Sequence, residues 1–146
     1  MGFNAFTEGL YAKQMADEFG LYADDPLGRL GYLQAHRFRA ARLVVDTGLH
    51  DKRWSRERAI QTLVDATGRA EGAARSEIDR YCASPGQACG YKVGHTGIVR
   101  LREKAKTALG PRFDVRDFND AVVRTGGLPL TVLETVVDDW IAHPAA

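Results

Sequence analysis

Residues 80–94, Arg-Tyr-Cys-Ala-Ser-Pro-Gly-Gln-Ala-Cys-Gly-Tyr-Lys-Val-Gly, interrupt a chain that otherwise has a helical pattern. A helix arrives at Tyr81 and is broken at 84–86, Ser-Pro-Gly. Ser84 is a favoured N-cap and Pro85 fits a first helical position, so we expect a second helix to begin there at once. Glycines permit close backbone approach. Two interpretations stay open: a tight corner packed in a core, or the lining of a site.

Upstream of this corner, start and stop signals predict four helices. The first covers residues 5–19. Asp25 and Pro26 are typical of an N-cap followed by a first helical residue, and they predict a helix from Pro26 to about Leu49, closed by Gly48. Ser55 predicts the start of a helix to about Thr67, and a further helix is expected from about residue 73 to 83.

Downstream, a long helix is expected to run to about Leu109, where Gly110 and Pro111 form a stop signal. Glycines at 90, 94 and 97 form a smooth strip on it, where another helix or a ligand can come close. Two more helices begin at Asp114 and near Leu128. Since no segment alternates with period two, the sequence predicts a single all-α domain over 1–146, with about six or seven helices.

Composition excludes several classes of protein. The 146 residues hold 20 basic and 19 acidic side chains, a net charge of +1, which argues against a nucleic-acid binder. An alternative is nucleic-acid binding through the arginine-rich second helix. No apolar run approaches 18 residues, so we expect no contact with a membrane. The N-terminus lacks the pattern of a secretory signal. A cytoplasmic location is therefore expected, unless a longer precursor carries its signal upstream.

Single charged and sulfur-bearing residues give further expectations. Arg42 precedes an apolar run on the second helix, so its guanidinium should lie near the core and need a partner, for which we expect Asp46 one turn later. Cys82 and Cys89 are seven residues apart, which fits neither a CxxC pair nor a disulfide framework. We expect the two cysteines to be free thiols that pack as small hydrophobic side chains in the core.

The chain carries no complete catalytic constellation. Its four histidines show no metal-ligand spacing, and there is no His-Glu-x-x-His motif or phosphate-binding loop. His50, at a helix end beside Asp51, is the histidine best placed to line a cleft.

A longer series of motifs nevertheless resembles the bacterial domain of unknown function 885 family, whose members are helical and similar to zinc metallopeptidases of the gluzincin type. The resemblance covers nearly the whole chain. The residues that carry it are Arg-Leu-Val-Val-Asp-Thr-Gly-Leu-His at 42–50, Trp-Ser-Arg-Glu at 54–57, Arg-Tyr at 80–81, Pro-Gly-Gln-Ala at 85–88, Tyr-Lys-Val-Gly at 91–94, Leu-Gly at 109–110, Phe-Asp at 113–114, Phe118, and Leu-Pro-Leu at 128–130.

The resemblance implies that this chain is the C-terminal part of a longer fold. Family members carry a His-Glu…His zinc helix upstream, which is absent here, so zinc belongs to the parent family and this chain alone is expected to bind none. Glu8 matches the family's third metal ligand, although the two residues that the family has between Gly9 and Leu10 are missing. Asn119 stands where the family more often has histidine.

The resemblance also implies a set of substrate-side residues. His50, Arg80, Tyr81 and Tyr91 are the implied catalytic-side residues, while Arg42 and Gln87 would bind a peptide substrate. A hydroxyl or ring donor can stabilise an oxyanion, and an arginine can take a carboxylate in a bidentate manner. Two functions follow. The chain is the inactive C-terminal portion of a peptidase-like enzyme that needs its missing N-terminal half, or it is a non-enzymatic helical interaction module that forms homo-oligomers.

Overall fold

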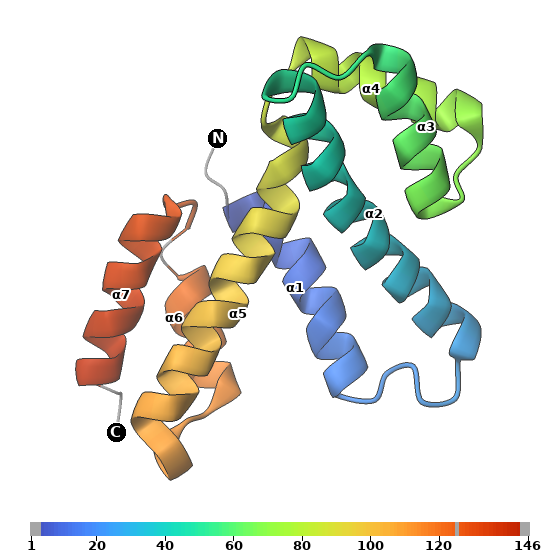
Figure 1. The fold of residues 1–146 in the computed structure, drawn as a ribbon. Helices are drawn as coiled ribbons and strands as arrows, with labels where there is room; N and C mark the ends of the chain where they lie inside the picture. Colours follow the sequence, from blue (N-terminus) through green and yellow to red (C-terminus); the bar gives the residue numbers. More distant parts are fainter. Residues whose placement is uncertain (1–3, 125, 144–146) are drawn as a thin grey trace. The chain divides into compact units, whose positions relative to one another are not determined.

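The computed structural model describes the backbone of residues 4–124 and 126–143, and side chains from Gly9 onward within those ranges. Over these residues it holds seven α-helices, two short 3-10 helices and no strand, so the all-α prediction is confirmed (Figure 1). No helix among the described residues is long and apolar enough to cross a membrane. The elements are α1 (Asn4–Glu18), α2 (Pro26–His50), α3 (Arg56–Thr67), α4 (Glu71–Ala83), η1 (Gln87–Cys89), α5 (Gly90–Leu109), η2 (Gly110–Arg112), α6 (Val115–Val123) and α7 (Leu130–Ala142).

The chain forms two compact units. Unit 1 contains residues 1–11 and 93–146, and unit 2 contains residues 12–92. The boundaries fall inside α1 and α5, so each of these helices contributes to both units. The single domain expected over 1–146 stays a prediction.

The start of α2 is as predicted and its end lies one residue beyond the predicted Leu49, but Gly48 does not close the helix. The Asp25 side chain accepts a hydrogen bond from the Gly28 backbone N–H at 2.8 Å, and Pro26 is the first helical residue. The helix continues through Gly48 to His50. Gly48 is buried inside the helix because the Trp54 ring lies on it: a Cβ at this position would be 2.4 Å from the ring. The glycine therefore serves a close side-chain contact and does not end the helix.

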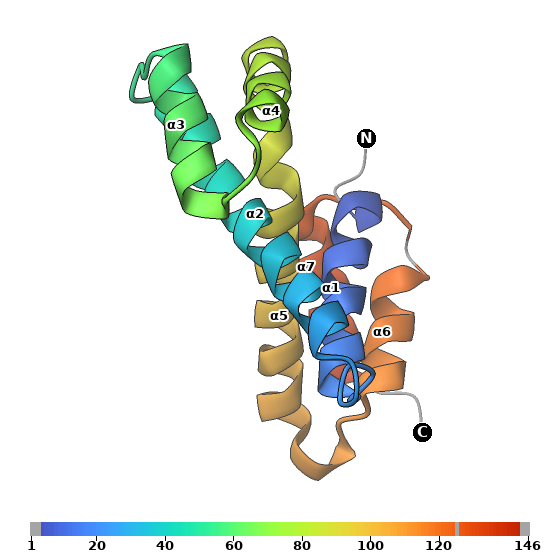
Figure 2. The same cartoon turned by 90° about the vertical axis from the view of Figure 1, so that its right-hand side faces the viewer.

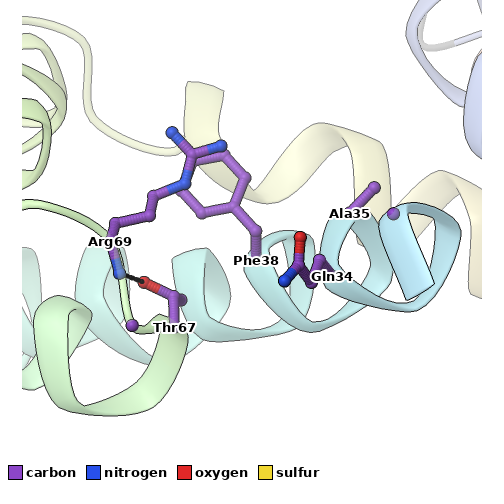
Figure 3. Close-up of a pocket in the computed structure, with 7 residues that line it drawn as sticks. Gln34, Ala35, Phe38, Thr67 and Arg69 are labelled. Atoms are coloured by element: carbon purple, nitrogen blue, oxygen red, sulfur yellow. Dashed lines mark hydrogen bonds between the residues drawn. The ribbon is translucent and has the colours of Figure 1, made fainter. Parts of the chain in front are cut away.

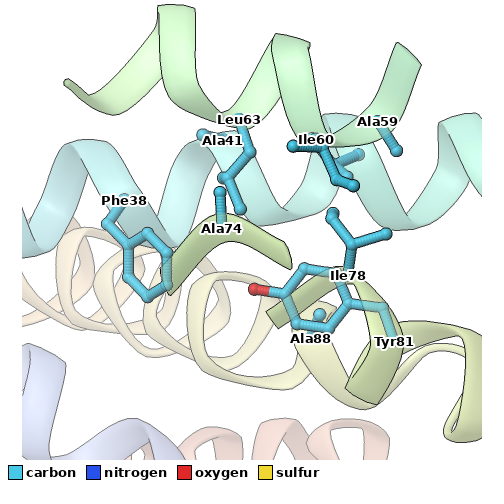
Figure 4. Packing of buried hydrophobic residues seen from close by; sticks show 10 residues of the cluster. Phe38, Ala41, Ala59, Ile60, Leu63, Ala74, Ile78, Tyr81 and Ala88 are labelled. Atoms are coloured by element: carbon cyan, nitrogen blue, oxygen red, sulfur yellow. The ribbon is translucent and has the colours of Figure 1, made fainter. Parts of the chain in front are cut away.

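The core of unit 2 lies between α2, α3 and α4. The two cartoon views show α3 beside α2 (Figures 1 and 2). Val45 of α2, Leu63 of α3, and Ile78 and Tyr81 of α4 are fully buried in one cluster. Figure 4 shows Leu63, Ile78 and Tyr81 of this cluster. Burying one such aliphatic side chain contributes roughly 1.5–3 kcal/mol. This packing fixes α4, and with it the residues that precede the corner at 84–86.

The corner itself differs from the prediction. Ser84 is the C-terminal cap residue of α4 and not an N-cap, since its backbone N–H returns to the Tyr81 carbonyl. Gly86 then takes a positive φ of 79°, which L side chains adopt rarely. One 3-10 turn, η1, intervenes before α5 begins at Gly90.

Of the two cysteines beside this corner, Cys82 is exposed and Cys89 half-buried, so the expectation of two buried thiols was wrong.

Unit 1 is held by pairs of residues between α5 and α7 and between α6 and α7. Gly97 of α5 would place a Cβ 3.2 Å from Leu130 of α7, so the expected close approach along the glycine strip occurs here. Arg100 of α5 and Glu134 of α7 form a bidentate ion pair, with N–O distances of 2.9 and 2.8 Å. The Asp114 side chain caps α6, as predicted, and Phe118 of that helix lies edge-on to Trp140 of α7.

Candidate anion site in unit 2

The clearest site is an open pocket of about 240 Å³ in unit 2. Two helices, a 3-10 turn and the first turn of α5 supply its walls. The lining residues are Arg39 and Arg42 of α2, Glu77 and Arg80 of α4, Gln87 of η1, and Tyr91. Three of these six side chains are cationic and one is anionic, so the pocket carries a local positive charge.

Arg42 forms the floor of this pocket and is 2% exposed. Its guanidinium carbon lies 5.4 Å from the ring centre of Tyr81 and 5.5 Å from that of Tyr91. Cation–π contacts of this kind stabilise a desolvated charge by about 2 kcal/mol. No carboxylate of the described residues forms an ion pair with this guanidinium, and its buried Nε has no hydrogen-bond partner.

The expected pairing of Arg42 with Asp46 is wrong. Asp46 is buried too, but its carboxylate accepts hydrogen bonds from the backbone N–H of Gly86, at 3.0 and 3.3 Å. Asp46 thereby holds the corner, and burial together with this carboxylate raises the pKa of the Cys89 thiol. Arg42 instead donates from Nη2 to Oε1 of Gln87 at 3.3 Å.

Gln87 joins two cations through one neutral oxygen. Its Oε1 accepts hydrogen bonds from Arg42 and also from Arg80. An amide oxygen satisfies donors but brings no negative charge. Burial lowers the pKa of Arg42, and the nearby charges of Arg39 and Arg80 lower it further, against the opposing effects of Tyr81 and Glu77. The guanidinium remains protonated at neutral pH in any case.

Glu77 is the single acidic residue of the pocket and is already paired. Its Oε2 accepts hydrogen bonds from Arg80 Nη2 and from the Tyr81 hydroxyl, each at 2.6 Å. Burial would raise the pKa of Glu77, but these two hydrogen bonds outweigh it and lower the pKa. Burial and the Glu77 carboxylate raise the pKa of Tyr81 well above its ordinary value. Tyr81 is therefore a neutral donor that fixes Glu77.

Comparison with known proteins places the chain in a family. A family model described as "Bacterial protein of unknown function (DUF885)" matches residues 1–137. The chain belongs to the DUF885 family. A solved structure described as "the putative lipoprotein from Colwellia psychrerythraea" is 54% identical, with a TM-score of 0.91 over 95% of this chain. This DUF885 chain spans 24% of the length of that protein. No curated protein matches it.

The pocket brings together four of the substrate-side residues that the DUF885 resemblance implied. Arg42, Arg80, Gln87 and Tyr91 all line it. Tyr81 lies beneath it, fully buried. Glu77 also lines the pocket, but the sequence prediction did not include it. Helical spacing could have identified it, because Glu77 is three residues before Arg80 and therefore within reach of its guanidinium.

The other two predicted site residues, His50 and Glu8, do not line this pocket as far as the structure describes them. His50 does not line the pocket, and its Nε2 is 3.1 Å from the backbone oxygen of Tyr81. Arg39, which was not predicted, places its guanidinium carbon 4.2 Å from the centre of the Tyr91 ring. The Glu8 side chain lies outside the described residues. Catalytic roles for these residues stay predictions.

A second pocket of about 280 Å³ lies between α2 and the end of α3 (Figure 3). Arg69 covers the ring of Phe38 there, with 3.8 Å from its guanidinium carbon to the ring centre. The backbone N–H of Arg69 donates to the Thr67 hydroxyl at 3.4 Å. Gln34 adds one amide group to the lining. Arg69 is the one cationic residue that lines this pocket, whereas three arginines line the pocket above Arg42, so this second pocket carries less positive charge.

Side chains that could bind a metal are too dispersed to form a site in the described ranges. No group of three or more His, Cys, Asp or Glu side chains comes together there. A structural or catalytic zinc ion needs at least three protein ligands. The described residues of this chain therefore do not fit a zinc site by themselves.

Proposed function

We propose that this chain is the C-terminal part of a longer zinc-dependent, peptidase-like protein and supplies the wall that holds the peptide substrate. The 24% coverage of a longer relative supports a place within a longer protein. The C-terminal position and the zinc-dependent, peptidase-like character are what the resemblance to the family implies. The observation that carries the second half is the environment of Arg42: a buried guanidinium whose hydrogen-bond partner is the neutral Gln87. Such a group can take a negatively charged part of a substrate.

The side chains around Arg42 have separate roles in this proposal. Arg42 and Arg80 hold the substrate charge, and Gln87 aligns the two guanidinium groups through its oxygen. Glu77 positions Arg80, while Tyr81 positions Glu77. Tyr91 lies at the wall of the pocket, where a phenol hydroxyl can donate to a developing oxyanion. His50, bound to the α4 carbonyl of Tyr81, keeps the end of α2 near α4.

Zinc, when present in the whole protein, would supply an activated water or polarise the scissile carbonyl. The described residues do not fit that metal, so we assign its ligands to the remaining part of the longer protein. Within this chain, we propose Glu8 as a ligand of that zinc ion. No step of the proposed substrate binding depends on the metal.

Unit 2 has exposed apolar side chains, which suggest that another part of the longer protein packs against them. Leu27, Leu30 and Leu33 of α2 are 78%, 50% and 51% exposed, and Phe19 and Leu21 just before this helix are exposed as well. Proteins seldom leave large apolar patches in water. We propose that the remaining three-quarters of the longer protein covers this face. Because the similar structure is described as a lipoprotein, we extend the proposal to an exported whole protein.

The alternative is a non-enzymatic interaction module, which the same leucines favour, since they would equally suit a second copy of this chain. Joining the chain to the missing portion of the Colwellia relative separates the two functions. Zinc-dependent peptide hydrolysis by the joined protein, absent from the chain alone, supports the enzyme. A well-folded joined protein that cleaves no peptide, together with a stable homodimer of the chain, supports the module.

A further inference from the structure

We propose that the pocket above Arg42 binds the free carboxylate at the C-terminus of a peptide. The whole protein would then act as an exopeptidase that recognises that end of its substrate. The assignment of the carboxylate to a peptide rests on the proposed function. The assignment of a carboxylate to the pocket rests on the geometry of the pocket itself.

The pocket is a built site, since its central cation is fixed from several sides. Arg42 is almost wholly buried, with Tyr81 and Tyr91 within 5.5 Å of its guanidinium carbon. Its Nε is buried and has no hydrogen-bond partner among the described residues. A buried donor without an acceptor is costly, and a charged one more so. An acceptor supplied by a ligand removes that cost.

The charges of the lining residues indicate whether the pocket favours a negatively or a positively charged ligand. Arg39, Arg42 and Arg80 bring three positive charges, and Glu77 brings one negative charge. The Glu77 oxygen that binds Arg80 is shared with the Tyr81 hydroxyl, so this carboxylate is occupied. Two positive charges remain without a counter-charge among the lining residues. The site therefore favours an anion.

The position of Gln87 indicates the shape of that anion. Its planar amide places an sp² oxygen where Arg42 and Arg80 converge. A carboxylate has the same planar shape as a carboxamide and adds a negative charge, so it can bind beside Gln87 while the amide oxygen keeps the two guanidinium groups aligned. Guanidinium groups bind carboxylates through two parallel hydrogen bonds. The open pocket of about 240 Å³ has room for the terminal residue of a peptide.

The test compares two small ligands of nearly the same shape that differ in their terminal group. N-acetyl-L-alanine carries a free carboxylate, and N-acetyl-L-alaninamide carries an amide in its place. Each is titrated into the 146-residue chain at fixed ionic strength, with chemical shifts of the tyrosine rings and arginine side chains as the readout. We expect the acid to bind with a Kd on the order of 1 mM and the amide at least about tenfold more weakly.

Matched variants show whether the pocket is responsible. Arg80→Gln removes one arm of the site and should weaken binding of the acid at least about tenfold. Arg75→Gln removes an arginine of the same helix that is paired with Glu71 outside the pocket, and should leave binding unchanged. Circular dichroism of both variants confirms that α4 persists.

Three outcomes would overturn the proposal: equal binding of the acid and the amide, tighter binding of inorganic phosphate than of the acid, or equal losses in the two variants. These outcomes concern binding alone. A failure of the proposed function appears separately, as a joined protein that binds the acid but hydrolyses no peptide.

Discussion

The guanidinium of Arg42 donates to the neutral amide oxygen of Gln87, 3.3 Å away, and forms no ion pair with Asp46, one turn further along the same helix. A charge in such a place is usually neutralised by a carboxylate. Here Asp46 instead binds the backbone of Gly86 and holds the corner between α4 and α5. The arrangement leaves the cation available to a ligand, and it leads to a prediction about stability.

Replacing Arg42 by methionine should remove carboxylate binding with little loss of stability. Exchanging a buried charge for an apolar side chain of similar volume is often neutral or stabilising. We expect the free energy of unfolding in urea to change by less than about 1 kcal/mol, or to rise. Arg37→Met, on the exposed side of the same helix, is the control. A loss above about 2 kcal/mol in Arg42→Met alone would show that the guanidinium serves the fold.

Two glycines of α2 should respond in opposite ways to alanine. At Gly48 a Cβ would be 2.4 Å from the Trp54 ring, so Gly48→Ala must displace the indole and should cost about 1–3 kcal/mol. At Gly31 a Cβ meets nothing within 4 Å, so Gly31→Ala should stabilise the helix by about 0.5–1 kcal/mol. Thermal unfolding of the two variants measures both effects. Equal shifts would contradict the contact between Gly48 and Trp54.

The ion pair between α5 and α7 predicts a dependence on acid. Hydrogen bonds from Arg100, with the charges of Arg100 and Lys104, lower the pKa of Glu134 from 4.5 to about 2. A carboxyl group with a depressed pKa in the folded state stabilises the protein above its unfolded pKa, and that contribution is lost as the pH falls toward the folded value. The difference in Tm between the wild type and Glu134→Gln should therefore be largest near pH 7 and shrink between pH 4.5 and 2.

The control for this ion pair is Glu103→Gln, which alters an exposed carboxylate of α5. Its Tm should follow that of the wild type more closely over the same pH range. A Glu134→Gln variant whose Tm difference stays constant from pH 7 to pH 3 would refute the role of the ion pair.

Zinc analysis tests whether the zinc ligands lie in this chain or in the rest of the longer protein. After dialysis against trace zinc, elemental analysis of the purified chain should find far less than one zinc ion per chain, because three ligands do not come together among the described side chains. The joined protein should retain about one ion. One zinc ion per copy of the chain alone would mean that it holds a complete metal site.

Local sequence signals predicted the helices well wherever local chemistry decides the boundary. The Asp25-Pro26 pair begins α2, and Asp114 begins α6, because both aspartates cap the backbone next to them. Gly48 shows the limit of such signals. A glycine that ends a helix and one that admits an indole ring look the same in sequence, and only the tertiary contact with Trp54 distinguishes them.

The site shows the same limit in its side chains. The family resemblance brought Arg42, Arg80, Gln87 and Tyr91 into one set, and these four do line one pocket. Sequence spacing paired Arg42 with Asp46, since the two residues are four apart on one helix. The actual partners depend on the corner at Gly86, whose N–H takes the carboxylate and whose turn presents Gln87 to the arginine. That geometry has no local signature.

Hydrolysis by the joined protein tests most directly whether this chain forms the carboxylate-binding wall of a peptidase. The measurement is kcat/KM for one short peptide with a free C-terminus and for the same peptide with an amidated C-terminus, with and without Arg80→Gln. We predict that the free acid is cleaved at least about tenfold more efficiently and that Arg80→Gln abolishes this preference. Equal cleavage of the two peptides, unaffected by the substitution, would contradict the claim.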